Sequence, residues 1–160
     1  MKRLLLLVCA LALLLCACTR EKNGKDTDVL AHEVRAALSD NTGFTEIDDD
    51  FVEISFDFLE KTDDATVLID NTSSTREIGI FHLRDQGDMS AVESGIQSYL
   101  HQEIDSLHSL ASLYPGAELT EKLQRYEKAT VLKSGSYIGY FVLDGNELAT
   151  AKAAFLAALQ

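Results

Sequence analysis

Three side chains in one stretch have the types and spacing of metal ligands: His101, Asp105 and His108. Intervals of four and three residues place them on one face of a helix. Imidazole nitrogens and a carboxylate oxygen are ligands that suit zinc and related metals. No second segment supplies an obvious fourth ligand, however, and the HExxH pattern of helical zinc sites is absent. An exposed polar helix face explains the pattern better, so we predict no cofactor and keep the metal site as an alternative.

Two short motifs invite a catalytic interpretation. Ser39-Asp40-Asn41 and Lys133-Ser134-Gly135 are similar to two of the three motifs of penicillin-recognising enzymes. The third motif, Ser-x-x-Lys, carries the nucleophile of those enzymes, and it occurs nowhere in this sequence. A Gly-x-Ser-x-Gly motif and a phosphate-binding glycine loop are absent as well. We therefore predict no reaction and take a noncatalytic protein as the main hypothesis.

Cys18 is the residue whose chemistry the sequence supports best. Lys2 and Arg3 precede an apolar run from residue 4 to residue 15, which is typical of an export signal. Leu15 and Ala17 then frame Cys18 in the spacing of the lipobox of bacterial lipoproteins. In those proteins the cysteine thiol receives a diacylglyceryl group and becomes the new N-terminus. Ordinary cleavage after Cys18 and an uncleaved anchor are the alternatives, although the run is shorter than the ~18 to 20 residues of a spanning helix.

Lipidation at Cys18 would divide the chain into three parts. Residues 1–17 would be the signal peptide, residues 18–27 the lipidated cysteine and a flexible tether, and residues 28–160 one globular domain. Two acyl chains anchor a protein stably where one chain does not. We expect the protein on the extracytoplasmic face of the cell membrane, with membrane lipid as its partner through Cys18.

The cysteines and the charges restrict the function further. Cys9 and Cys16 lie in the signal peptide and the lipid would occupy the thiol of Cys18, so the domain has no disulfide and no cysteine-based metal site. All 26 acidic residues follow Cys18 while two of the 14 basic residues precede it, which leaves the processed chain with a net charge of −14. Nucleic acid requires a basic binding face, so we exclude it as a partner. Asp48-Asp49-Asp50 lacks the alternating acids and glycine of a calcium loop and indicates a solvated acidic surface.

Hydrophobic periodicity predicts an α+β fold with a mainly antiparallel four-stranded sheet and helices packed on one face. Residues 30–38 and 88–114 and the segment around Leu119 and Leu123 have helical spacing, and a last helix begins near Asp144 or Asn146. The expected strands cover residues 65–70, 77–84, 129–133 and 136–143, the last two joined by a turn at Ser134-Gly135. Alternating apolar residues at 52, 54, 56 and 58 suggest a further strand, with a helix over residues 51–59 as the alternative.

The remaining histidines fit ordinary structural positions. His82 alternates with Ile78 and Ile80 in its strand, so we expect a half-buried histidine with a hydrogen-bond partner. His32 should lie on the surface of the first helix. Neither residue is predicted to bind a metal.

Several segments together resemble a known family. Glu77-Ile78-Gly79-Ile80-Phe81, Tyr114-Pro115, Glu118 and the Gly135-x-Tyr137 hairpin are similar to the small Gram-positive lipoproteins of the domain-of-unknown-function family numbered 4358. The resemblance covers roughly residues 28–159 and includes the lipobox, although His82 stands where a lysine is expected. It implies an envelope location and an α+β domain without an assigned activity.

These observations predict a lipid-anchored cell-envelope protein with a noncatalytic binding domain. Its partner would be an envelope protein or polymer. The alternative is an envelope hydrolase or metal-binding protein that uses the face of His101, Asp105 and His108.

Overall fold

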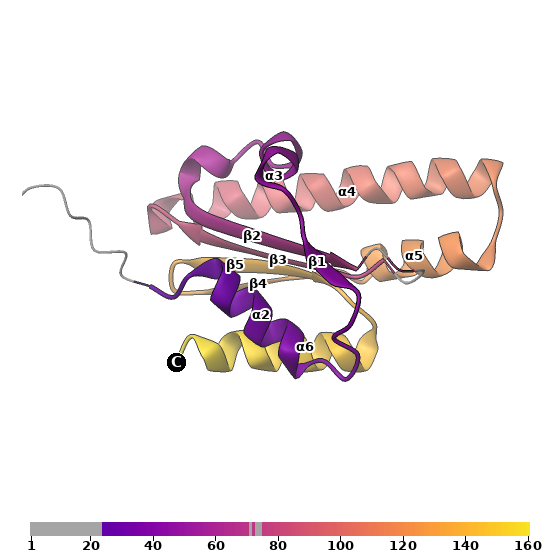
Figure 1. The fold of residues 1–160 in the computed structure, drawn as a ribbon. Coiled ribbons are helices and arrows are strands. Elements are labelled where there is room, and N and C mark those ends of the chain that lie inside the picture. Colours follow the sequence, from indigo (N-terminus) through magenta and orange to yellow (C-terminus); the bar gives the residue numbers. More distant parts are fainter. Residues whose placement is uncertain (1–23, 71, 73–74) are drawn as a thin grey trace, which may run out of the picture.

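One antiparallel sheet organises the chain, and the computed structural model describes residues 24–70, 72 and 75–160 (Figure 1). The predicted α+β class is confirmed. The helices are α2 (Thr27–Ala37), α3 (Asp49–Ser55), α4 (Met89–Leu113), α5 (Ala117–Glu127) and α6 (Gly145–Ala158). The strands are β1 (Phe44–Glu46), β2 (Thr62–Asp70), β3 (Glu77–Leu83), β4 (Thr130–Ser134) and β5 (Tyr137–Val142). Single 3-10 turns occur at Leu59–Lys61 and Gln86–Asp88.

The sheet has five strands, in the order β1-β2-β3-β5-β4. Four of them are the strands that the sequence predicts, and β1 is the fifth. Phe44 lies opposite Asp70 and Glu46 lies opposite Leu68, which makes β1 an edge strand beside β2. Three residues are too few to show an alternating pattern, so periodicity alone does not reveal this strand.

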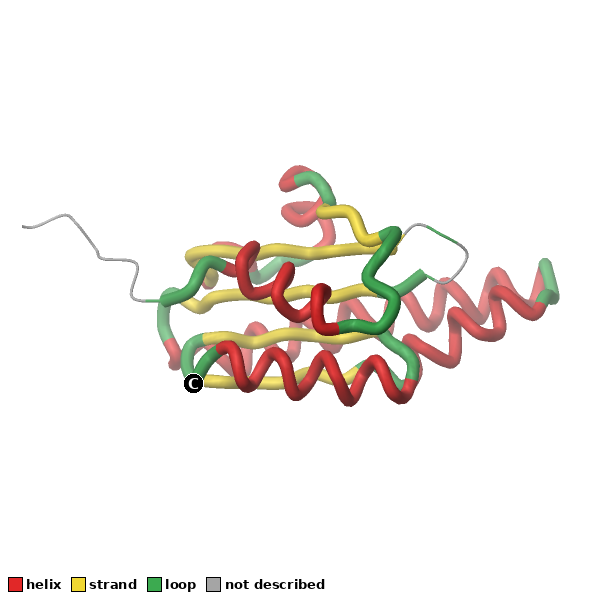
Figure 2. The backbone as a smooth tube through the Cα atoms, turned by 60° about the horizontal axis from the view of Figure 1, so that its bottom comes forward, coloured by secondary structure: helices red, strands yellow, loops and turns green. Residues whose placement is uncertain are grey.

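Helices cover both faces of the sheet, so the prediction that they pack on one face is wrong. Figure 1 shows α3, α4 and α5 on one side and α2 and α6 on the other, and Figure 2 shows α2 and α6 in front of the sheet, with α6 running along the strands. The physical reason lies in the two central strands, β3 and β5. Every residue of both strands is buried, and apolar side chains that alternate between two faces require cover on each face.

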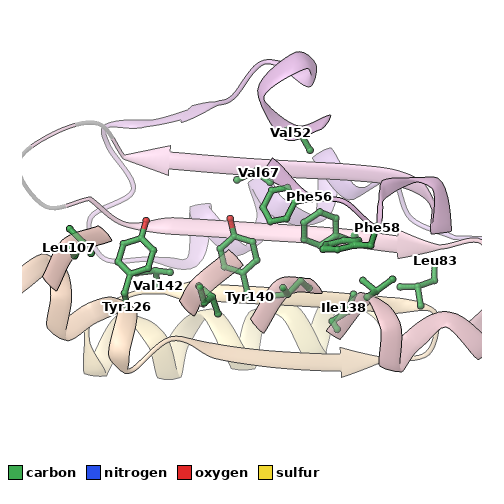
Figure 3. Packing of buried hydrophobic residues seen from close by; sticks show 14 residues of the cluster. Val52, Phe56, Phe58, Val67, Leu83, Leu107, Tyr126, Ile138, Tyr140 and Val142 are labelled. Carbon is green, nitrogen blue, oxygen red and sulfur yellow. The ribbon is translucent and has the colours of Figure 1, made fainter. Parts of the chain in front are cut away.

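Two hydrophobic clusters result, one on each side of the sheet. The first lies between the sheet and α3, α4 and α5, and Figure 3 shows part of it. Its aromatic centre contains Phe56, Phe58, Phe81 and Tyr140, with the rings of Phe56 and Phe81 5.1 Å apart. The second cluster packs α2 and α6 on the other face, and includes Leu30, Ile78, Phe141 and Phe155.

The predicted strand at residues 52–58 is wrong, because residues 49–55 form α3. The Asp48 side chain caps this helix by accepting a hydrogen bond from the backbone N–H of Asp50, at 2.9 Å. Val52 and Phe56 are buried and lie four residues apart, which is a helical interval. Ile54 would share their face in a strand, yet it is 85% exposed.

The β4–β5 hairpin is confirmed, but its turn lies one residue later than predicted. Ser134 pairs with Tyr137, so the loop consists of Gly135 and Ser136. Gly135 has a φ of 59°, a left-handed conformation that glycine adopts without a steric cost. Positive φ at the first of two loop residues is the pattern of a type II′ turn.

Candidate functional site

The face of α4 that carries His101, Asp105 and His108 does not assemble a metal site. All three residues are exposed, and the Nε2 atom of His108 lies 3.7 Å from Oε1 of Glu127 on α5. Among the residues that the structure describes, no three histidine, cysteine, aspartate or glutamate side chains come together in an arrangement that could hold a metal ion. The three predicted residues therefore share a helix face, and the neighbouring Glu127 does not complete a metal site with them.

His82 has a hydrogen-bond partner, as predicted, but it is more deeply buried than expected. It is 7% exposed, and its Nε2 atom lies 2.9 Å from the Oγ atom of Ser136 in the β4–β5 loop. Its ring packs against Tyr137, with ring centres 4.5 Å apart. His32 lies at the surface as predicted, where its Nδ1 atom is 2.7 Å from Oδ1 of Asp28.

The chain is fixed to the sheet from Lys25 onward, beside His82. The hydroxyl of Tyr137 donates a hydrogen bond to the backbone carbonyl of Lys25, at 2.7 Å. Thr27 is fully buried, and its backbone N–H donates to Oδ2 of Asp64 at 3.0 Å. Lys25 and Thr27, which belong to the predicted tether, thus contact the sheet. Cys18 and the rest of the predicted signal lie outside the described residues.

Glu77 forms the centre of a buried polar cluster that the sequence does not predict. It lies on β3, is 3% exposed, and its carboxylate accepts hydrogen bonds from three tyrosine hydroxyls. Tyr99 donates at 3.0 Å and Tyr140 at 3.2 Å, both to Oε2, while Tyr126 donates to Oε1. Figure 3 shows the rings of Tyr126 and Tyr140 side by side with their hydroxyl oxygens pointing the same way. We call these four residues the Glu77 cluster.

The Glu77 cluster joins the first helical layer to the sheet. Tyr99 comes from α4, Tyr126 from α5 and Tyr140 from β5. Burial raises the pKa of Glu77, and the tyrosine hydrogen bonds oppose this rise only in part. Burial and the neighbouring Glu77 also raise the pKa of Tyr99, Tyr126 and Tyr140. Because the carboxylate has almost no exposed surface, the cluster positions helices and offers no surface to a substrate.

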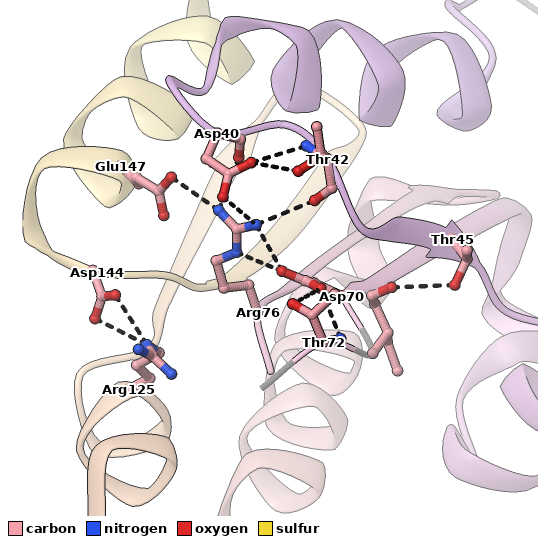
Figure 4. Close-up of polar contacts among 10 residues, drawn as sticks. Asp40, Thr42, Thr45, Asp70, Thr72, Arg76, Arg125, Asp144 and Glu147 are labelled. Carbon is pink, nitrogen blue, oxygen red and sulfur yellow. Dashed lines mark hydrogen bonds and ion pairs between the residues drawn. The ribbon is translucent and has the colours of Figure 1, made fainter. Parts of the chain in front are cut away.

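Arg76 forms the centre of a second buried cluster, at the opposite end of β3 from His82 (Figure 4). Its Nε and Nη2 atoms donate to Oδ2 of the fully buried Asp70, at 2.9 and 2.6 Å. Its Nη1 atom donates to the backbone carbonyl of Asp40 at 2.8 Å and to Oε1 of Glu147 at 3.0 Å. The guanidinium also lies over the ring of Phe44, 4.8 Å from its centre.

These contacts tie the loop after α2, the end of β2 and the start of α6 to one guanidinium. Burial opposes the charge of Arg76, but its partners Asp70 and Glu147 raise the pKa of the guanidinium above its ordinary value. Asp40 has a lowered pKa because the side chain and the backbone N–H of Thr42 donate hydrogen bonds to it. In the described part of the chain, every buried side-chain nitrogen and oxygen has a hydrogen-bond partner. Both clusters are therefore internally satisfied.

Two surfaces expose large apolar side chains. On α3, Phe51 is 49% exposed and Ile54 is 85% exposed. At the C-terminal end of α4, Leu113 is 71% exposed and Tyr114 is 69% exposed. Side chains of this size are usually better covered, and their grouping is typical of binding surfaces. The sequence does not reveal the α3 surface because its apolar residues are interpreted there as the inner face of a strand.

Comparisons with known proteins give no relative from which a function could be transferred. No protein-family model matches the chain. Searches of curated proteins and of solved structures also find no significant match. Within the described residues, no helix is both long enough and apolar enough to cross a membrane.

Proposed function

We propose that this protein is a lipid-anchored component of the cell envelope whose domain binds a partner without catalysing a reaction. In this proposal Cys18 carries the lipid, and the protein is similar to the small lipoproteins of family 4358. The observation that supports it most is the early start of the fixed domain. Only residues 19–24 separate the lipobox cysteine from Lys25, which is already bound to Tyr137.

The short tether determines which end of the domain would face the membrane. A flexible segment of six residues would span about 12 to 15 Å root-mean-square. The anchored domain would therefore keep the end with Lys25, His82 and Tyr137 close to the bilayer. In Figure 1 the far end of α4 lies opposite the point where the described chain begins, so it would point away from the membrane.

A binding role agrees with how the polar groups are arranged. The carboxylate of Glu77 and the guanidinium of Arg76 are both buried and are bound by neighbouring residues of the same domain. The surface carries exposed apolar side chains and the exposed acids of α3, which suit association with a partner. A domain of this kind needs no cofactor.

Fatty-acid labelling of the full chain in a bacterium that lipidates exported proteins would test the anchor. We expect label in the parent and in Cys16→Ser, but not in Cys18→Ser, because only Cys18 has Leu15 and Ala17 at the lipobox positions. Cys16→Ser is the matched control, since it removes a thiol two residues away. Label that persists in Cys18→Ser, or that disappears only in Cys16→Ser, would overturn the proposed anchor.

A further inference from the structure

The outer face of α3 carries two large apolar side chains that are exposed. Phe51 and Ile54 lie three residues apart, so they share one face of the helix. Their exposed fractions are 49% and 85%, whereas Val52, on the inner face, is 6% exposed. An 85% exposed isoleucine gains almost nothing from folding. The pair therefore offers apolar area that only a second molecule could cover.

The charge around this pair is strongly negative. Asp49, Asp50 and Glu53 are exposed on the same helix. Within the part of the chain that the structure describes, none of these three carboxylates is placed in an ion pair. Lys61 is the one basic residue between positions 40 and 70, and its Nζ atom lies beside Glu60 and Asp88, at 3.7 and 3.5 Å. The negative charge of α3 is thus free to meet a positive partner.

A hollow of about 250 Å³ continues this acidic surface between α3 and β2. Four carboxylate residues line it, together with apolar and hydroxyl groups: Asp49, Glu53, Asp63 and Asp64. The described residues contain no group of ligands that could hold a metal ion there. Asp63 already lies 3.2 Å from Nε of Arg84, and Asp64 accepts a hydrogen bond from the backbone N–H of Thr27. A flexible cationic side chain would fit the size of the hollow and would meet Asp49 and Glu53 at its α3 side.

We propose that α3 is a docking surface for a cationic amphipathic segment of another protein. Apolar residues of that segment would cover Phe51 and Ile54, and its lysine or arginine side chains would meet Asp50 and Glu53. This inference rests on the proposed function, because it supplies the chemistry of the partner for the proposed binding domain.

Charge distinguishes this partner from the other candidates for the surface. A second copy of the chain would bring a second set of carboxylates against the first, and like charges placed together oppose association. An anionic membrane surface is repelled by Asp49, Asp50 and Glu53 for the same reason. Leu113 and Tyr114 at the end of α4 differ, because the residues that follow them, Pro115, Gly116 and Ala117, carry no charge. The surface formed by Leu113 and Tyr114 therefore does not indicate the charge of a partner, and it provides a control.

The test uses the full chain in phosphatidylcholine nanodiscs and a fluorescent helical peptide of leucine and lysine, with its leucines on one face. Binding is followed by fluorescence anisotropy, with empty nanodiscs as the blank. The double variant Phe51→Ser, Ile54→Ser removes the apolar pair, and Leu113→Ser, Tyr114→Ser is the matched control. We expect the first variant to bind the peptide about tenfold more weakly or worse, a loss of about 1.4 kcal/mol or more, because the variant no longer buries the apolar area of the two side chains on binding. The control should change the affinity less than about twofold.

A second variant, Asp50→Asn, Glu53→Gln, keeps the shape and removes two charges. We expect weaker binding and a smaller dependence on salt, because fewer charge pairs form in the complex. Equal losses in both apolar double variants would show unspecific attraction of a cation to an acidic protein and would overturn the inference. Absence of binding by the parent would overturn it as well. So would recruitment to phosphatidylglycerol nanodiscs that depends on Phe51 and Ile54, because the occupant would then be a membrane.

The outcome can be separated from the fate of the lipid anchor. All variants of α3 retain Cys18 and should incorporate fatty acid like the parent. Loss of peptide binding specificity with intact labelling would therefore reject only the docking surface. Far-UV circular dichroism should be unchanged in every variant, since Phe51, Ile54, Asp50 and Glu53 are exposed.

Discussion

The hydroxyl of Tyr126 on α5 donates a hydrogen bond to the carboxylate of Glu77 on β3, across 49 residues of sequence. Tyr99 and Tyr140 donate to the other oxygen of the same carboxylate. One acidic side chain thus binds two helices and a strand inside the first hydrophobic cluster. Such a buried titratable group makes the stability of the fold depend on pH.

We expect Glu77 to stabilise the domain more in acid than at neutral pH. Burial raises its pKa above the ordinary value of 4.5, so the folded state binds the proton more tightly than the unfolded chain. The stabilising contribution of this group is therefore complete below about pH 4.5 and is lost as the pH rises through the raised pKa. Glu77→Gln should lack this loss. Urea unfolding of the parent and the variant from pH 4 to pH 8 measures the difference.

The prediction concerns the difference in the free energy of unfolding between the parent and Glu77→Gln, because all other carboxylates titrate in both proteins. The gap in the free energy of unfolding should shift in favour of Glu77→Gln as the pH increases. A gap that stays constant over the whole range would contradict the raised pKa. Tyr126→Phe removes a donor without removing the carboxylate. Its free energy of unfolding should therefore still fall relative to that of Glu77→Gln as the pH rises.

Gly79→Ala should destabilise the protein by about 1 to 3 kcal/mol, which is typical of an overpacked core. A Cβ atom at Gly79 would lie 2.0 Å from Cε1 of Tyr140, so the ring would have to leave its position beside Glu77. Gly145→Ala is the control, because a Cβ atom there meets nothing within 4 Å. Thermal unfolding of both variants checks the prediction, and equal melting temperatures would refute it.

Asp70→Ala should cost about 3 to 5 kcal/mol, because it removes one partner of a buried ion pair and leaves Arg76 poorly compensated. Asp70 is fully buried and accepts two hydrogen bonds from Arg76. The control Asp144→Ala removes the ion pair with Arg125, in which the Asp144 side chain is 60% exposed, and should cost below about 1 kcal/mol. Chemical denaturation ranks the two, and a smaller effect for Asp70→Ala would be the contrary result.

Protein purified from defined medium should contain far less than one zinc ion per chain. His101, Asp105 and His108 are exposed and receive no further ligand among the described residues, so they cannot enclose a metal ion. Elemental analysis of the parent and of His101→Ala, His108→Ala would measure this. Stoichiometric metal that disappears in the double variant would instead favour the metal-binding alternative.

The sequence predicts the elements whose patterns are long and local. The stripe from Met89 to Ala111 has enough turns to define α4, and Gly135 marks the β4–β5 hairpin. Residues 49–55 are ambiguous because Val52 and Phe56 lie at intervals that fit both a strand and a helix. Only tertiary packing, which leaves Ile54 outside, decides between them.

The buried clusters could not be predicted because their members are distant in sequence. Glu77 is noticeable as an acid within an apolar strand, but no local pattern connects it with Tyr99, Tyr126 and Tyr140. Arg76 is similar, since its partners Asp40 and Glu147 lie 36 and 71 residues away. The cover on both faces of the sheet follows from the same long-range packing.

The central position of β3 also determines how the backbone would exchange hydrogen with solvent. β3 pairs with β2 on one side and with β5 on the other, and helices cover both of its faces. Local fluctuations that expose α3 or the sheet edges leave these amide groups protected. Deuterium should therefore enter β3 only when the whole domain unfolds, and its exchange rate would report the global free energy of unfolding.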